Sequence, residues 1–178
     1  MNERETAKGS TMKFAQQYSR ATYSSNLRSD KHHSDVDKLA AVALSSELGT
    51  FLFRVKYAND ATTYPALLLK WQEIVGKKAL RRNWPKHITA RKVATASLDY
   101  WLNDVCQACS GRCFEPLANT PTVLSDVACR TCQGRGKKPL VCEANWRDFI
   151  LQLVDELEDL ARSAAGAAMR KLAADMHI

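Results

Sequence analysis

Apolar residues recur at three- and four-residue spacing over several stretches of the chain, and this pattern predicts a mainly helical protein. The first expected helix begins at Ser34-Asp35-Val36-Asp37, which resembles a capping box, and runs to about Tyr57. The second runs from Pro65 to about Leu80, because proline is tolerated at the first position of a helix.

Two further helices follow the same pattern. Trp84-Pro85 interrupts the second helix, and Thr89 is expected to cap a third that leads directly into Cys106. Asn145 is expected to cap a long final helix. Gly166 is the weak point of that helix, because glycine in an exposed helix interior costs about 1 kcal/mol relative to alanine.

These elements divide the chain into four parts. Residues 1–33 are mostly polar and are expected to form a flexible arm, whereas residues 34–105 form a helical body. Residues 106–142 contain glycines and prolines with little periodicity, and residues 143–178 form the final helix on the body. The predicted fold is thus mainly α, a helical body with a small inserted module of β-turns and hairpins and a long C-terminal helix.

The inserted segment, called the cysteine module below (residues 106–142), contains two similar motifs. The first reads Cys106-Gln-Ala-Cys109-Ser-Gly111-Arg-Cys113 and the second Cys129-Arg-Thr-Cys132-Gln-Gly134-Arg-Gly136. Two residues between cysteines let one tight turn direct both sulfur atoms at a single ion, and the following glycine permits the backbone conformation of such a turn. The spacing between the pairs also fits a four-cysteine zinc site.

We therefore expect Cys106, Cys109, Cys129 and Cys132 to bind one structural Zn²⁺ ion, because four thiolates leave no open coordination position. Cys113 and Cys142 are surplus to this set and are interpreted as small, partly buried thiols, although either could replace one of the four. A filled coordination sphere disfavours a metal-dependent enzyme. We expect a cytosolic protein, and because the cytosol keeps thiols reduced, the two cysteine pairs are better interpreted as metal ligands than as disulfides.

Positive charge is concentrated in the first two thirds of the chain. Residues 1–105 carry 17 Lys and Arg against 10 Asp and Glu, the cysteine module carries 5 against 2, and the remainder carries 4 against 7. This distribution suits a protein that meets a polyanion with one surface, although a solvated basic face explains the charge equally well.

The densest basic segment surrounds Trp84-Pro85 and contains no acidic residue. A helix, a turn and a second helix with cations at the junction resembles a helix-turn-helix unit, so we expect double-stranded DNA to contact this segment. The cysteine module provides a second basic surface that includes Arg112. The candidate nucleic-acid contacts are Lys77, Lys78, Arg81, Arg82, Lys86, Arg91, Lys92, Arg130, Arg135, Lys137 and Lys138.

The two cysteine motifs and their helical frame resemble the antitermination protein Q family of lambdoid bacteriophages. The resemblance covers about a third of the chain, from Ile88 to Trp146, and includes Thr89-Ala-Arg-Lys-Val93 and Leu98-Asp-Tyr-Trp-Leu102. It implies a non-enzymatic factor that binds a late promoter DNA element and engages the bacterial RNA polymerase holoenzyme, which then ignores terminators. It also implies zinc ligation by Cys106, Cys109, Cys129 and Cys132.

A second hypothesis is a DnaJ-like zinc-module chaperone or peptide-binding adaptor, because the two cysteine motifs also resemble those of the DnaJ zinc module. It is weakened by the absence from the sequence of a His-Pro-Asp tripeptide and of further cysteine pairs. No uncharged apolar run in the sequence approaches the length of a membrane span. We expect no membrane association and a location in the cytoplasm of a bacterial host cell.

Overall fold

The computed structural model describes residues 15–22, 41, 46–117 and 120–174. After a helical segment at residues 15–22, its elements are α3 (Glu47–Tyr57), α4 (Tyr64–Arg81), α5 (Ala90–Leu102), β1 (Phe114–Leu117), β2 (Thr120–Ala128), a short 3₁₀ helix (Ala144–Trp146) and α6 (Arg147–Ala174). The described chain is mainly helical and carries one antiparallel two-stranded sheet, as predicted.

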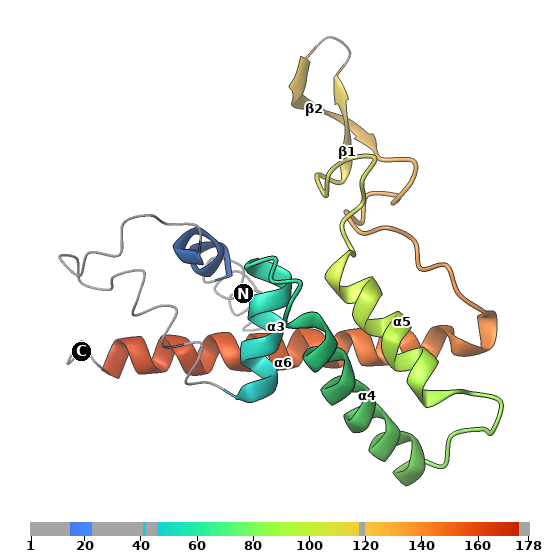
Figure 1. The fold of residues 1–178 in the computed structure, drawn as a ribbon. Coiled ribbons are helices and arrows are strands. Elements are labelled where there is room, and N and C mark those ends of the chain that lie inside the picture. Colours follow the sequence, from blue (N-terminus) through green and yellow to red (C-terminus); the bar gives the residue numbers. More distant parts are fainter. Residues whose placement is uncertain (1–14, 23–40, 42–45, 118–119, 175–178) are drawn as a thin grey trace.

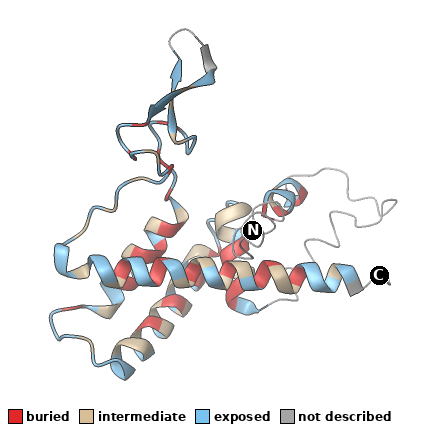
Figure 2. Cartoon of the chain, turned by 180° about the vertical axis from the view of Figure 1, so that it is seen from behind, coloured by how far each residue is buried: buried red, intermediate tan, exposed pale blue. Residues whose placement is uncertain are grey.

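The long helix α6 supports the other helices of the body. Helices α3, α4 and α5 gather along its side, and α4 and α5 run in opposite directions (Figure 1). The apolar stripe predicted for α6 is buried, including Ile150, Leu153, Leu157 and Ala168. Figure 2 shows that buried residues are concentrated on the facing sides of these helices. Burial of this stripe is the main apolar contribution of α6 to stability.

Two tryptophans form the centre of the core. Trp71 of α4 and Trp101 of α5 are fully buried, and each indole N–H has a partner. Nε1 of Trp71 donates to the buried Ser97 hydroxyl at 3.1 Å, and Nε1 of Trp101 donates to Glu158 of α6 at 2.8 Å. Paired indoles avoid the cost of a buried donor without a hydrogen bond, so they fix how α4, α5 and α6 meet.

The N-terminal part of the chain differs from its prediction. Residues 15–22 are helical, and Ala15 and Tyr18 are buried in the core. The ring of Tyr18 meets Phe53 of α3 edge-on, with 5.3 Å between ring centroids. The expectation that residues 1–33 form an arm is wrong for this segment, because two apolar positions one turn apart suffice to dock a short helix. The rest of that range lies outside the described residues.

The first predicted helix also begins elsewhere. Ser46 has extended backbone angles, and its hydroxyl accepts a hydrogen bond from the Gly49 N–H at 3.0 Å. A residue with this geometry caps a helix, so α3 starts at Glu47 and a continuous helix from Ser34 to Tyr57 is wrong. The predicted capping box at residues 34–37 lies outside the described residues.

Smaller differences occur at the other helix ends. Thr89 occupies the cap position of α5 as predicted, but its side chain makes no capping hydrogen bond. Helix α5 ends at Leu102 rather than continuing to Cys106, since Val105 pairs as an isolated β-bridge with Lys137. A 3₁₀ turn precedes α6 where Asn145 was expected to cap it.

Candidate metal centre and its basic surroundings

The two cysteine motifs fold into matching turns. Ser110 and Gly111 have φ angles of 50° and 77°, and the corresponding Gln133 and Gly134 have 52° and 79°. Left-handed angles are readily available to glycine and uncommon in other residues, which explains the glycine in each motif. The turns close through the Gly111 N–H on the Cys106 carbonyl at 3.0 Å and the Gln133 N–H on the Cys129 carbonyl at 2.7 Å.

These turns bring the four predicted ligands together. The sulfur atoms of Cys106, Cys109, Cys129 and Cys132 all lie within 4.8 Å of one another, and all four residues are buried. The Gly136 N–H also donates to Sγ of Cys132 at 3.3 Å, so the backbone of the second motif directly contacts one of the four sulfur atoms. Four buried sulfur donors at this separation can hold one metal ion, so the predicted grouping is confirmed.

The two surplus cysteines lie outside this group. Cys113 follows the first turn, and its thiol contacts the Gly111 carbonyl at 3.6 Å. Cys142 is partly buried and packs against the helical core, away from the cysteine group. Their positions agree with the interpretation of both as thiols outside the ligand set.

The cysteine module is joined to the helical body at the C-terminal end of α5. The Cys106 N–H donates to the Gly136 carbonyl at 2.9 Å, and the Lys138 N–H donates to the Asp104 carbonyl at 2.8 Å. The hydroxyl of Tyr100 in α5 donates to the Lys138 carbonyl at 2.8 Å. These hydrogen bonds connect the end of the second cysteine motif to the C-terminal end of α5. The attachment of the module to the body therefore depends on the second motif being folded.

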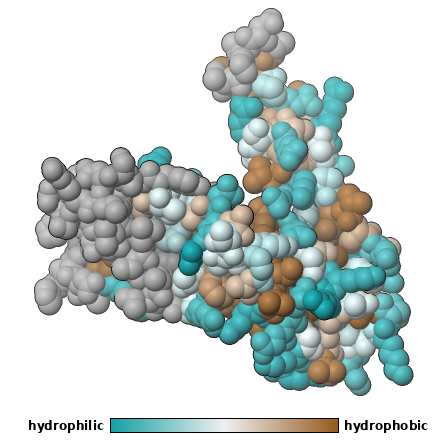
Figure 3. All heavy atoms as spheres, in the orientation of Figure 1, coloured by the Kyte–Doolittle hydropathy of each residue, from teal (hydrophilic) through white to brown (hydrophobic). Residues whose placement is uncertain are grey.

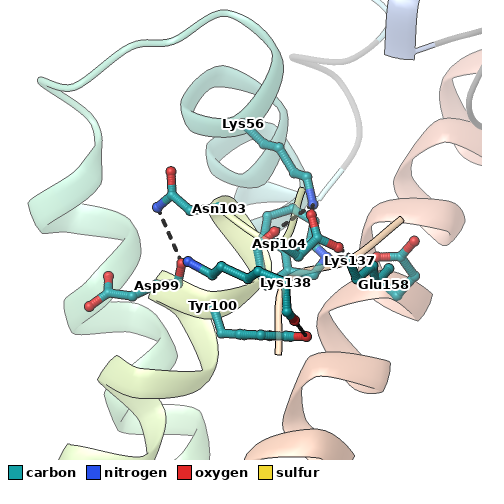
Figure 4. A network of polar contacts seen from close by, with 9 residues as sticks. Lys56, Asp99, Tyr100, Asn103, Asp104, Lys137, Lys138 and Glu158 are labelled. Atoms are coloured by element: carbon teal, nitrogen blue, oxygen red, sulfur yellow. Dashed lines mark hydrogen bonds and ion pairs between the residues drawn. The ribbon is translucent and has the colours of Figure 1, made fainter. Parts of the chain in front are cut away.

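A charge cluster centred on the buried Asp104 reinforces this junction (Figure 4). Asp104, which is only 7% exposed, lies 2.7 Å from Nζ of Lys137 and 3.7 Å from Nζ of Lys56. Lys56 also donates to the Trp101 carbonyl at 2.6 Å and lies 3.9 Å from the centroid of the Trp101 ring. The cluster thus links α3, α5 and the module.

Burial and the charge of Asp104 act in opposite directions on the pKa of Lys56 and of Lys137. Burial lowers the pKa of Lys56, an effect that the negative charge of Asp104 only partly offsets. For Lys137, burial acts in the same direction, but the hydrogen bond and charge of Asp104 outweigh it and raise the pKa. Lys137, which was predicted to contact DNA, forms an ion pair with Asp104. No sequence motif indicated the roles of Asp104 and Lys56, because the residues of this cluster are distant in sequence.

The basic residues of 77–92 divide into two groups. Four of them contact other side chains of the protein. Lys77 pairs with Glu73 at 2.5 Å, Lys78 pairs with Glu156, Arg91 donates to Gln72 at 3.1 Å, and Lys92 lies 6.0 Å from the Trp146 ring centroid. These contacts reduce the charge that Lys77 and Lys78 in particular can offer to a polyanion.

The second group is Arg81, Arg82 and Lys86, called the loop cations below. They are exposed at the connection between α4 and α5, and within the described residues no carboxylate pairs with any of them. The connection itself is fixed, because Trp84 packs edge-on against Phe149 at 4.5 Å between centroids and Ile88 is buried. Arg81 thus ends α4, and Arg82 and Lys86 lie on the well-anchored loop that follows it.

The geometry of this connection is not that of a helix-turn-helix unit. Eight residues, 82–89, join two helices that run in opposite directions (Figure 1), whereas the DNA-binding motif has a shorter turn and strongly crossed helices. Helix α5 also buries Val93, Ala94 and Leu98 between its neighbours. The predicted helix-turn-helix arrangement is therefore wrong, and the loop is the exposed element.

The cations of the cysteine module form a separate group. Nε of Arg112 donates to the Cys109 carbonyl at 3.2 Å and Nε of Arg135 to the Cys132 carbonyl at 3.1 Å, so each arginine closes its own turn. Arg130 lies 3.4 Å from Glu115, and Lys138 lies 5.9 Å from the Tyr100 ring centroid. The thirteen residues of α5, about 20 Å long, separate this group from the loop cations.

Comparison of the chain with protein-family models, curated proteins and solved structures finds no match. Among the described residues, no helix combines the length and the apolar character needed to cross a membrane.

Proposed function

We propose that this chain is a zinc-stabilised, DNA-binding transcription antitermination factor. It binds a promoter DNA element and modifies bacterial RNA polymerase so that terminators are read through. The observation that carries this proposal is the exposed group Arg81, Arg82 and Lys86, which lies at the end of α4 and on the anchored loop after it, within a segment free of acidic residues. Cations held in this way are suited to phosphate contacts that position a protein on DNA.

The metal in this proposal is structural. Zn²⁺ is held by Cys106, Cys109, Cys129 and Cys132, since four thiolates suit it and fill its tetrahedral site. The module buries few apolar side chains of its own, so the free energy of metal binding, on the order of 10 kcal/mol, supplies much of its folding energy. The metal thereby fixes Arg112, Arg130 and Arg135 as a second basic surface.

The role at RNA polymerase rests on the resemblance of the cysteine motifs and flanking helices to the antitermination protein Q family. The two basic groups at opposite ends of α5 support it, because contacts separated by about 20 Å can reach phosphates at different places along one duplex.

The test is transcription in vitro on a template with the chain's candidate promoter region and a downstream terminator. Purified holoenzyme polymerase and zinc-loaded protein should increase the read-through product. The variant R81A/R82A/K86A should lose most of this increase. Its matched control is K70A/K77A, which removes two exposed lysines already paired with Glu47 and Glu73. Wild-type protein without any effect on read-through would refute the proposed function.

A peptide-binding adaptor is the second candidate, and exposed apolar side chains on the β1–β2 hairpin favour it. This function predicts that the protein suppresses aggregation of an unfolded model protein at stoichiometric ratios. If replacing Val123 and Val127 of the hairpin by threonine abolishes this suppression and leaves read-through unchanged, the adaptor function would be favoured over antitermination.

A further inference from the structure

The β1–β2 hairpin, residues 114–128, is the most isolated element of the described chain. It projects from the helical body at the far end of the cysteine module, and both views show it clear of the helices (Figure 1, Figure 2). The sheet has two strands, and no described element covers either face. A two-stranded hairpin of this kind is marginally stable alone, so its attachment to the two cysteine turns maintains it.

Apolar side chains on this hairpin are open to solvent. The exposed fraction is 40% for Phe114, 46% for Leu117, 48% for Val123, 37% for Leu124 and 54% for Val127. The space-filling view shows hydrophobic surface on the described part of the module (Figure 3). Clustered exposure of this kind marks interaction sites, whereas scattered single apolar residues are ordinary.

The edges of the hairpin are poor sites for adding a strand. Pro116 lies within β1, and the register shifts between Phe114 and Pro116. At this irregularity the Ser125 hydroxyl donates to the Glu115 carbonyl at 2.8 Å and accepts from the Val127 N–H at 3.2 Å. Prolines and bulges discourage pairing at a sheet edge. A partner would therefore contact the side chains.

The charge of the hairpin disfavours a phosphate backbone as that partner. Its 15 residues contain no Lys or Arg, and their two carboxylates are Glu115 and Asp126. Glu115 pairs with Arg130, whereas Asp126 is exposed and forms no ion pair within the described residues. An exposed, unpaired carboxylate is repelled by nucleic acid and attracted to a positive surface.

From these observations we propose that the two strands β1 and β2 are a protein-docking element that inserts into an apolar groove with a basic rim on a partner protein. The apolar side chains fill the groove, and Asp126 meets the rim. This inference rests on the proposed function, because the choice of RNA polymerase as the partner to test comes from that function. DNA contact then belongs to the two basic groups at the ends of α5, and protein contact to the hairpin.

The experiment measures binding of purified bacterial RNA polymerase holoenzyme to immobilised, zinc-loaded full-length chain without DNA. V123T/V127T removes apolar surface while keeping β-branched side chains, and D126K reverses one exposed charge. The matched control is L69Q/V141T, which changes two exposed apolar residues outside the hairpin. Both hairpin variants should weaken polymerase binding by about tenfold, as expected for residues at an interface centre. Zinc content and DNA affinity should not change, and the control should bind as wild type.

Three results would overturn the docking proposal. Equal polymerase affinity for wild type and hairpin variants would show that another surface is used, while normal read-through would leave the proposed function intact. Tighter DNA binding by D126K would place the hairpin on nucleic acid. If sedimentation velocity shows that the wild-type protein self-associates and that V123T/V127T does not, the partner of the hairpin would be a second copy of this chain. Wild-type protein that binds neither polymerase nor DNA would refute both proposals.

Discussion

Gly136 and Cys113 occupy the same position in the two cysteine motifs, and both have left-handed backbone angles, with φ of 69° and 71°. They also lie against each other. A Cβ atom added to Gly136 would be 2.9 Å from the Gly111 carbonyl oxygen and 3.0 Å from Sγ of Cys113. The two turns are thus related by a local pseudosymmetry, in which only one of the equivalent positions can carry a side chain.

This relationship predicts opposite effects at the two positions. Gly136→Ala should destabilise the module by more than the roughly 1 to 2 kcal/mol that left-handed angles alone cost, because the new methyl group overlaps backbone. Cys113→Gly should raise stability by up to about 1 kcal/mol, because it relieves the strain of a positive φ. Urea unfolding of the zinc-loaded protein measures both.

Gly134→Ala is the matched control for Gly136→Ala. Gly134 has a φ of 79°, but its added Cβ would meet Ala128 at an ordinary 3.7 Å. Gly134→Ala should therefore lose only the stability that a left-handed backbone angle costs a residue with a side chain, and nothing from overlap with neighbouring atoms. A loss for Gly134→Ala as large as that for Gly136→Ala would contradict the role assigned to the contact with Gly111.

Metal analysis tests the ligand set. The purified protein should contain about one zinc ion per chain, and Cys132→Ser should lose it together with the fold of residues 106–142, because the other three thiolates cannot complete the tetrahedron. Cys142→Ser should keep the metal, since Cys142 packs on the helical core. Two ions per chain, or full retention by Cys132→Ser, would show that the assigned set is wrong.

The sequence predicted those features that depend on local spacing. The ligand group follows from two short motifs, and the buried stripe of α6 follows from helical periodicity. It could not predict features that depend on contacts across the chain. Tyr18 lies in a mostly polar segment, and only its contact with Phe53 of α3 explains its burial. No residue near Asp104 in the sequence indicates its ion pairs with Lys56 and Lys137. The start of α3 was missed because Ser34 and Ser46 both precede apolar periodicity, and sequence alone does not rank two such caps.

Two helical glycines offer simple stabilising substitutions. An added Cβ at Gly76 of α4 would meet no atom within 4 Å, and at Gly166 of α6 it would meet only the guanidinium of Arg170 at 3.5 Å. Each change to alanine should raise the free energy of unfolding by up to about 1 kcal/mol, because alanine loses less backbone entropy in a helix. Thermal unfolding checks this, and a lower melting temperature for Gly76→Ala would mean that this face of α4 is covered in solution.

Tyr57 should make the protein sensitive to alkali. Burial, with smaller contributions from the charges of Glu158 and Asp104, raises the pKa of this phenol from 10.0 to about 12. The folded protein holds the proton more tightly than the unfolded chain, so this stabilisation is complete below pH 10 and is lost as the pH rises to 12. Wild type should lose up to about 2 kcal/mol from this group.

The variant Tyr57→Phe isolates that contribution, because it keeps the ring and has no proton to lose. Its free energy of unfolding should fall less steeply than that of wild type between pH 10 and 11.5 in urea titrations at constant ionic strength. Parallel curves for the two proteins would show that the Tyr57 hydroxyl is not desolvated as the structure has it.

The last prediction concerns the salt dependence of DNA binding, which distinguishes the two groups of cations in residues 77–92. Each cation that contacts a phosphate releases condensed counterions, so the slope of log affinity against log salt concentration should flatten by roughly one unit for every contact removed. R81A/R82A/K86A should therefore flatten the slope by about two to three units and weaken binding most at low salt. K70A/K77A removes cations paired with Glu47 and Glu73, and its slope should stay close to that of wild type. Fluorescence anisotropy with a labelled duplex from 50 to 300 mM salt gives both quantities, and zinc content and helicity show that each variant is folded. Equal slopes for the triple variant and wild type would mean that the loop is only a solvated basic surface. R112A/R130A/R135A would then be the variant expected to flatten the slope, which would place the DNA contact on the cysteine module.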